Sequence, residues 1–145
     1  MEGKRRTSDE GIETEHIGDL LEGAENDLRG ALILMKTHSD EMSKNPYANV
    51  AFLLQESIKR HLIALLVSKG VVLKSQPLFQ VLLNKSMENG LMVNPLSLEW
   101  QAVNRKRYPE DHAVLPPNYS KRDIDAFFRI TDEVKSNVYA LIEAG

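Results

Sequence analysis

The stretch QESIKRHLIALLVSKG, from Gln55 to Gly70, predicts the helix around which the other helices of this chain pack. Together with the residues just before it, this stretch carries one apolar stripe at i, i+3/4 and i+7 spacing and a second stripe further round the helix. Such an arc is wider than one packing surface needs, which is typical of a bundle centre or of a subunit contact. Lys69 suits the negative end of the helix dipole, and Gly70 favours a stop there. The two stripes are Ala51, Leu54, Ile58, Leu62 and Leu65, and Phe52, Ile63, Leu66 and Val67.

The length and composition indicate one globular domain. The chain has 145 residues, 42% of them hydrophobic, which is within the globular range and enough for a core. Its longest apolar run, Leu62 to Val67, is too short for a membrane span, and its charged beginning predicts no secretory signal. It has no cysteine, which excludes disulfides, thiolate metal sites and cysteine nucleophiles. We therefore expect a cytoplasmic protein without a membrane segment, and the net charge of −3 argues against a surface coated with basic residues.

Hydrophobic periodicity predicts further helices on both sides of this stretch. We expect helices at about 16–37, about 46 or 47 to 69, about 77–88, about 96–107, and from 120 to the C-terminus. Ser120 with Asp123 forms a capping-box start for the last helix, and three prolines exclude regular structure in the loop before it. Residues 1–15 are polar, and we expect a disordered tail there. The prediction is an all-α domain over residues 16–145, a five-helix up-and-down bundle with three long and two short helices.

The two short helices carry fewer apolar residues, and we expect these to face the long helices. The inward residues are Leu78, Val81, Leu82 and Met87 on the first, and Leu98, Trp100, Ala102 and Val103 on the second. Trp100 and Tyr108 could instead stack on nucleic-acid bases, but an aromatic side chain near a helix end in a small bundle is more often part of the core.

Five basic residues form the strongest candidate for a binding site. If the middle of the second helix lies near the end of the fourth, they would form an anion-binding patch suited to a nucleotide or RNA. The alternative is that each belongs to a solvated helix face, with Lys59 and Arg60 opposite Glu56. The five residues are Lys59, Arg60, Arg105, Lys106 and Arg107.

The histidines offer little other chemistry. His16, His38, His61 and His112 show no metal-ligand spacing, so we expect no metal and no cofactor. His61 lies at the edge of an apolar stripe, where a half-buried histidine with one ordinary hydrogen bond is a simpler interpretation than a general base. Arg107 and His112 could form an RNA-cleaving pair, in which arginine holds a phosphate and histidine acts as general base. On spacing alone, a surface turn is the simpler interpretation.

Three strings follow one another in an order that matches a known family. The string from Ser57 to Gly70 is similar to a helix of pattern A-x-E-K-x-L-K-A-L-L-x-x-x-G. Its direct matches are Leu62, Ala64, Leu65, Leu66 and Gly70. Ala24, Asp27, Leu28 and Ala31 are similar to an A-x-x-D-L-x-x-A first helix, and Arg107-Tyr108-Pro109 resembles an R-Y-P string after the fourth helix. In this order, over roughly residues 21–144, the chain resembles the HEPN family (higher eukaryotes and prokaryotes nucleotide-binding domains).

The chain departs from the family pattern at polar positions. The family glutamate falls on Lys59, and its two lysines fall on Arg60 and Ile63. A common histidine-aspartate pair near the start of the third helix falls on Gln76-Pro77. The apolar positions are kept, which favours a retained fold over a retained activity.

The resemblance also bears on the arginine-histidine pair. Family members that cleave RNA carry an R-x(4–6)-H pair with a polar residue such as asparagine just after the arginine. Arg107 with His112 fits this spacing, and so does Arg105 with His112. A tyrosine or a lysine follows these arginines instead, and Pro109 breaks the helix that normally presents the pair.

What the resemblance implies is a five-helix bundle that often dimerises. Many members pair with a nucleotidyltransferase in toxin–antitoxin or related systems. Our leading hypothesis is a non-catalytic, nucleotide- or RNA-associated homodimer that acts with a nucleotidyltransferase-type partner. The alternatives are a metal-independent endoribonuclease that uses Arg107, or Arg105, with His112, and a helical protein-interaction module with no nucleotide role.

Overall fold

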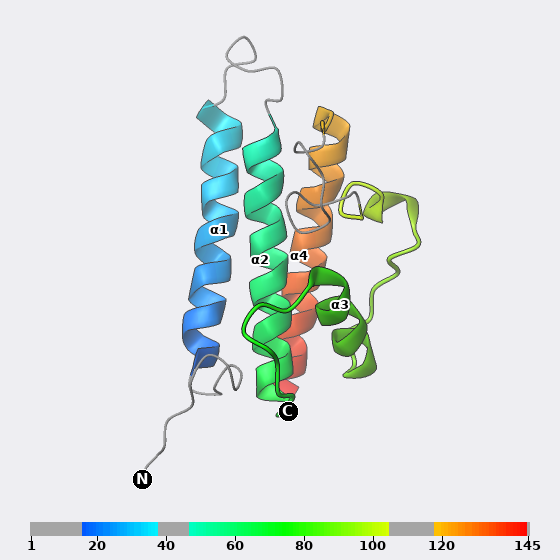
Figure 1. Ribbon diagram of the computed structural model, residues 1–145. Helices are drawn as coiled ribbons and strands as arrows, with labels where there is room; N and C mark the ends of the chain where they lie inside the picture. The colour runs from blue at the N-terminus through cyan, green and yellow to red at the C-terminus, as the bar shows by residue number, and fades with distance from the viewer. Residues whose placement is uncertain (1–15, 38–46, 105–117, 145) are drawn as a thin grey trace.

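The computed structural model describes residues 16–37, 47–104 and 118–144. These residues form four α-helices and one 3-10 helix, and there is no strand among them. The elements are α1 (Ile17–Thr37), α2 (Ala48–Ser68), α3 (Phe79–Glu88), the 3-10 helix η4 (Leu98–Trp100) and α4 (Lys121–Ala144). The three long helices lie side by side, with α1 antiparallel to α2 and α4 running in the same direction as α2 (Figure 1). The predicted all-α bundle is confirmed at this level, and the expected tail at 1–15 lies outside the described residues.

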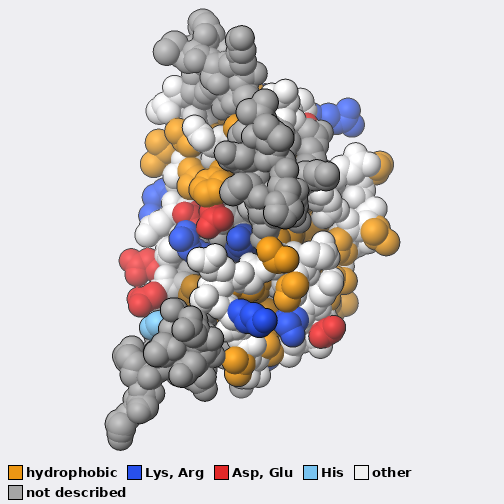
Figure 2. All heavy atoms as spheres, viewed as in Figure 1, with side chains coloured by type: hydrophobic (Ala, Val, Ile, Leu, Met, Phe, Trp, Pro, Cys, Tyr) orange, Lys and Arg blue, Asp and Glu red, His pale blue; other side chains and the backbone are white. Residues whose placement is uncertain are grey.

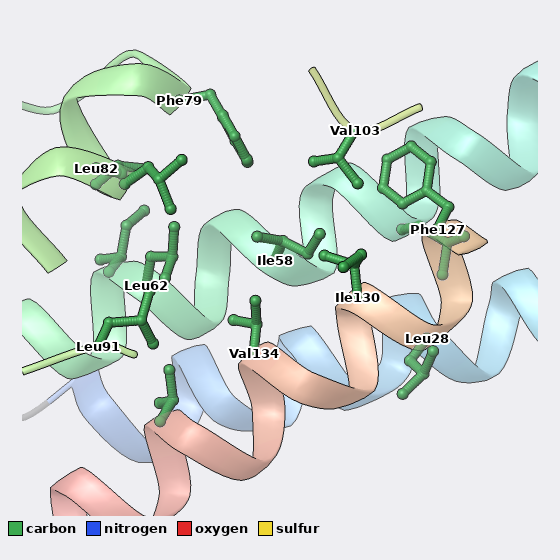
Figure 3. Close-up of a cluster of buried hydrophobic side chains, with 14 of the residues drawn as sticks. Leu28, Ile58, Leu62, Phe79, Leu82, Leu91, Val103, Phe127, Ile130 and Val134 are labelled. Carbon is green, nitrogen blue, oxygen red and sulfur yellow. The ribbon is translucent and has the colours of Figure 1, made fainter. Parts of the chain in front are cut away.

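The central helix is α2, which packs closely against α1, α3 and α4. Both predicted stripes meet neighbours in the same chain, apart from Phe52, which is 51% exposed. Figure 3 shows Ile58 pointing toward Ile130 and Val134 of α4, while Leu62 lies on the side of α3. The wide apolar arc is therefore used within one chain, and it does not by itself indicate a subunit contact.

The helix ends follow the local sequence. After α2, the backbone N–H of Gly70 donates to the carbonyl of Val67 at 3.0 Å, and Gly70 has a φ of 78°. This left-handed conformation suits glycine and satisfies a carbonyl that the helix leaves unpaired. At the start of α4, the backbone N–H groups of Ser120 and Asp123 each donate to the other's side chain at 3.0 Å. The predicted stop of α2 and the predicted capping box are both confirmed.

The predicted fourth helix, at about 96–107, is wrong in its described part. As far as residue 104 the chain forms only η4 and turns, and residues 105–107 lie outside the described ranges. Asn94 Oδ1 accepts the backbone N–H of Leu96 at 3.2 Å, and Asn104 Nδ2 donates to the carbonyl of Pro95 at 2.7 Å. These asparagine side chains bond backbone groups that a helix would otherwise use, which favours turns. The described residues therefore hold four α-helices, and the predicted count of five is not reproduced among them.

The inward faces of the short elements agree with the prediction only in part. Trp100, Ala102 and Val103 are buried as expected, whereas Leu98 is 80% exposed. On α3, Leu82 is buried, but the other three expected core residues are not. Leu78, Val81 and Met87 are 55%, 40% and 39% exposed, and the buried set is Phe79, Leu82, Leu83 and Ser86. The helix begins at Phe79 rather than at Pro77, and it faces the core with a different apolar stripe.

Candidate functional site

Most of the predicted site residues lie outside the described ranges. Arg105, Lys106, Arg107 and His112 belong to the segment 105–117, so the five-residue patch and the arginine-histidine pair remain predictions. Within the described ranges, no group of three histidine, aspartate or glutamate residues is arranged to hold a metal ion. Among the same residues, none of the helices combines the length and the apolar character needed to cross a membrane.

Lys59 and Arg60 line a groove of about 510 Å³, which we call the connector groove. Its walls are the first turn of α1, the middle of α2 and residues 75–78, which connect α2 to α3. The polar lining residues are Glu56, Lys59, Arg60, Ser75 and Gln76, and the apolar ones are Leu20, Ile63, Pro77 and Leu78. The volume falls within the range of about 300–1,000 Å³ that is usual for small-molecule sites. Figure 2 shows Lys or Arg and Asp or Glu side chains close together on the face formed by α1 and α2.

Arg60 is held at the edge of this groove by α1. Its Nη1 donates to Asp27 Oδ2, and the two side chains are 40% and 14% exposed. Gly23 leaves the space for this arginine, because a Cβ at Gly23 would lie 3.3 Å from Arg60 Cδ. The expected pairing of Arg60 with Glu56 is replaced by an ion pair between two helices. One guanidinium nitrogen is used in this pair, and the group has other N–H donors for a ligand.

A second polar cluster lies between α1, α2 and α4. His61 is completely buried, and its Nδ1 lies 2.9 Å from the backbone carbonyl oxygen of Ser57. Nearby, Lys135 Nζ donates to Glu25 Oε1 at 3.0 Å, and the Tyr139 hydroxyl donates to Glu25 Oε2 at 3.1 Å. The rings of His61 and Tyr139 have their centres 6.0 Å apart. Glu25 therefore bridges α1 to α4 beside the buried histidine.

The environment favours the neutral form of His61. Burial lowers its pKa, and the opposing effects of the Ser57 carbonyl and the Glu25 carboxylate do not overcome it. Burial also raises the pKa of Glu25, but the hydrogen bonds from Lys135 and Tyr139 and the charge of Lys135 leave it lowered overall. In the neutral ring, Nδ1 donates to Ser57, and Nε2 has no hydrogen-bond partner in the described part of the chain.

This geometry argues against His61 as a general base. A general base must reach the proton it removes, directly or through one water molecule. His61 has no exposed surface. The expected single hydrogen bond is confirmed, but the histidine is fully buried rather than half-buried.

A second groove, of about 530 Å³, lies between η4 and the first half of α4. Arg122, Asp123, Arg129 and Glu99 supply its charges, and Arg129 Nε donates to Glu99 Oε2 at 3.0 Å. Positive and negative side chains are balanced here, so the groove favours no ligand charge. Sequence analysis did not predict it, because its two walls are about 25 residues apart and share no motif.

Only part of the contacts around the connector groove could be expected from the sequence. Asp27, the partner of Arg60, belongs to the string that resembles the family's first helix, whereas nothing in the sequence pointed to Glu25, Lys135 or Tyr139. Comparisons of the chain with protein-family models, with curated proteins and with solved structures each returned no match.

Proposed function

We propose that this chain is a HEPN-like helical bundle that binds a nucleotide or RNA without cleaving it. It acts as a homodimer with a nucleotidyltransferase-type partner, in a toxin–antitoxin or related system. The connector groove is the binding site. The proposal rests on the resemblance of the sequence strings and on one observation about where the departures from that pattern lie.

The departures from the family pattern that fall within the described residues lie in one place, and those around the arginine-histidine pair lie outside these residues. Three of them are on α2 and two are on the connector, separated by more than ten residues in the sequence. All five line the connector groove: Lys59, Arg60, Ile63, Gln76 and Pro77. Apolar positions that build the core are kept, while the polar positions around this groove are replaced. This pattern supports a binding site whose ligand differs from that of a typical family member.

The residues that line the groove suit a phosphorylated ligand that also carries a flat, partly apolar group. Lys59 and Arg60 offer charge-assisted donors to a phosphate. Ile63, Pro77 and Leu78 offer an apolar wall to a base. Glu56 adds one negative charge, which disfavours a ligand with a high charge density and suits a mononucleotide or a single RNA nucleotide.

The two described histidines support the non-catalytic part of the proposal. His61 is enclosed, and the other described histidine, His16, does not line the connector groove. The endoribonuclease alternative depends on Arg107 or Arg105 with His112, and these residues lie outside the described ranges. The interaction module with no nucleotide role predicts no nucleotide binding at all, so the experiment below separates it from our proposal.

The test is a calorimetric titration of the protein with a ribonucleoside monophosphate and with a short single-stranded RNA. Lys59→Ala should weaken binding by about ten- to a hundredfold, because a charge-assisted hydrogen bond contributes about 1.5–3 kcal/mol. Lys36→Ala is the matched control, since Lys36 is an exposed lysine in the last turn of α1, away from the groove. Binding that is equally strong in both variants would exclude the connector groove, and no binding by the wild type would exclude the nucleotide role.

Asp27→Asn should change the nucleotide affinity in the opposite direction to Lys59→Ala. This change removes the carboxylate that pairs with Arg60 and leaves the guanidinium to a ligand phosphate. We expect several-fold tighter nucleotide binding together with a small loss of stability. Unchanged or weaker binding in a folded Asp27→Asn variant would contradict a role for Arg60. The partner is tested separately, by identifying the proteins that co-purify with the tagged chain from its native cell.

A further inference from the structure

The outer side of α3 and the segment after it expose an unusual number of large apolar side chains. We call this surface the α3 face. It includes three residues that were expected in the core, one just before α3 and two on it, and three more that lie after α3, the last of them at the start of η4. The six residues are Leu78, Val81, Met87, Met92, Leu96 and Leu98. Figure 2 shows hydrophobic side chains over the part of the molecule where Figure 1 places α3 and the following segment.

The exposed area is of the size that a protein interface requires. Leu96, Leu98 and Met92 are 95%, 80% and 79% exposed, and the α3 residues are each about half exposed. The six side chains together expose on the order of 300–400 Å² of apolar surface. A typical interface buries about 800 Å² per partner, rather more than half of it apolar. The α3 face therefore supplies most of the apolar part of one interface.

The polar groups on the α3 face are few and largely satisfied. Between residues 78 and 98 the sequence has only two charged residues, Lys85 and Glu88. Gln80 and Asn84, on the exposed side of α3, bond to each other, with Gln80 Nε2 donating to Asn84 Oδ1 at 3.0 Å. Depletion of charge and enrichment of methionine are typical of the centre of an interface, and homodimer interfaces are the most apolar of the common kinds.

From these observations we infer that the α3 face binds a second copy of this chain. In a two-fold contact the same surface is used by both copies, so each residue must tolerate its own counterpart or a neighbour of it. Apolar side chains tolerate their own copies. Lys85 and Glu88 are one helical turn apart, so in an antiparallel pair of α3 helices each lysine faces the partner's glutamate. The surface is therefore complementary to itself in charge as well as in polarity.

This inference names the surface of the homodimer in the proposed function and rests on that part of it alone. It does not depend on the connector groove or on a nucleotide. Leu78 belongs both to the lining of the connector groove and to the α3 face. In a dimer formed through the α3 face, each of the two connector grooves would therefore border the interface.

The experiment is sedimentation velocity of the full chain over a concentration series from the low to the high micromolar range. The test variant is Met92→Asp with Leu96→Asp, which places two negative charges on each copy of the α3 face. The matched control is Leu32→Asp with Ile33→Asp, because these residues are apolar and exposed on α1, at 46% and 54%. All four positions are exposed, so neither variant removes a core contact.

We expect a dimer for the wild type and for the control, and at least a hundredfold weaker association for the test variant. A dimer that survives in the test variant would overturn the α3 face and leave the homodimer itself intact. A wild type that stays monomeric at all concentrations would overturn both the α3 face and the homodimer. The connector groove would still be tested separately by the nucleotide titration. A second measurement uses Met87→Cys, because pairing of Lys85 with the partner's glutamate places the two-fold axis between residues 86 and 87. This cysteine should cross-link between copies under mild oxidation, since the chain has no other cysteine. Cross-linking no faster than that of Ile33→Cys would also count against the surface.

Discussion

The buried histidine should make the stability of this protein depend on pH near neutrality. The pKa of His61 is lowered from 6.5 by burial, which outweighs the carboxylates of Glu25 and Asp27, while Lys135 adds to the lowering. Below about pH 6.5 the unfolded chain therefore binds a proton that the folded chain does not bind. The stability that comes from keeping His61 neutral is fully present above pH 6.5 and is lost as the pH falls below it.

The size of this effect follows from linkage. Each pH unit between the unfolded and folded pKa values costs about 1.4 kcal/mol for one group. Between about pH 7.5 and about pH 5.5 the loss is therefore as much as about 1.4 kcal/mol, since most of that interval above 6.5 contributes nothing. The assay is urea unfolding at several pH values, followed by circular dichroism. Carboxylates titrate mainly below this window, so Glu25 contributes little to the change.

His61→Gln is the variant that isolates the effect, because glutamine does not titrate. The variant should be less stable than the wild type at neutral pH, and the difference should shrink by about 1 kcal/mol at the acidic end. His16→Gln serves as the control for replacing an exposed histidine. A constant difference between wild type and His61→Gln over the same range would refute a buried, neutral histidine in the folded state.

Four further predictions concern the bundle itself and are measured by urea unfolding at neutral pH. Leu62→Ala should cost about 2–5 kcal/mol, since Leu62 is fully buried in the central helix, and a cost below about 1 kcal/mol would contradict the core. Gly70→Ala should cost about 1 kcal/mol through its positive φ alone. Gly90→Ala should cost more, because a Cβ there would also lie 3.2 Å from Leu141 Cδ2. Glu25→Gln should cost about 0.5–1 kcal/mol, because the pair with Lys135 is only partly buried, and a double-mutant cycle with Lys135→Ala should recover most of that value.

The long helices could be predicted because the spacing of apolar residues repeats over many helical turns in each of them. The sequence of α4 repeats core-facing residues over about five turns, at Ile124, Phe127, Thr131, Val134, Val138 and Leu141. The first five are buried, and Leu141 is partly buried. An error of one residue in the position of a boundary does not change which side of such a helix is apolar. The α2 arc was predicted correctly as wide, but periodicity alone could not say whether the second stripe met the same chain or another copy.

The predictions for the short elements were wrong because these elements contain too few turns for the apolar spacing to define one side. In the ten residues of α3, apolar side chains occur on two adjacent sides, and each side has two or three of them. Placing the start at Pro77 selected Leu78 and Val81 for the core, whereas the start at Phe79 buries Phe79 and Leu83 instead. Around η4, two asparagine side chains form hydrogen bonds with backbone groups and favour turns over a helix. Hydrophobic periodicity does not report such hydrogen bonds.

The candidate site was hidden from the sequence by distance along the chain. Arg60 and Asp27 are 33 residues apart in the sequence, so charge patterning along one helix could not predict that they form an ion pair. In the folded chain, Arg60 pairs with Asp27 of α1 rather than with Glu56 of its own helix. This ion pair places a helix contact at the wall of the connector groove, so a ligand that recruits the guanidinium competes with α1 for it. Ligand binding and the attachment of α1 to α2 are therefore coupled through a single side chain, which is why Asp27→Asn should move affinity and stability in opposite directions.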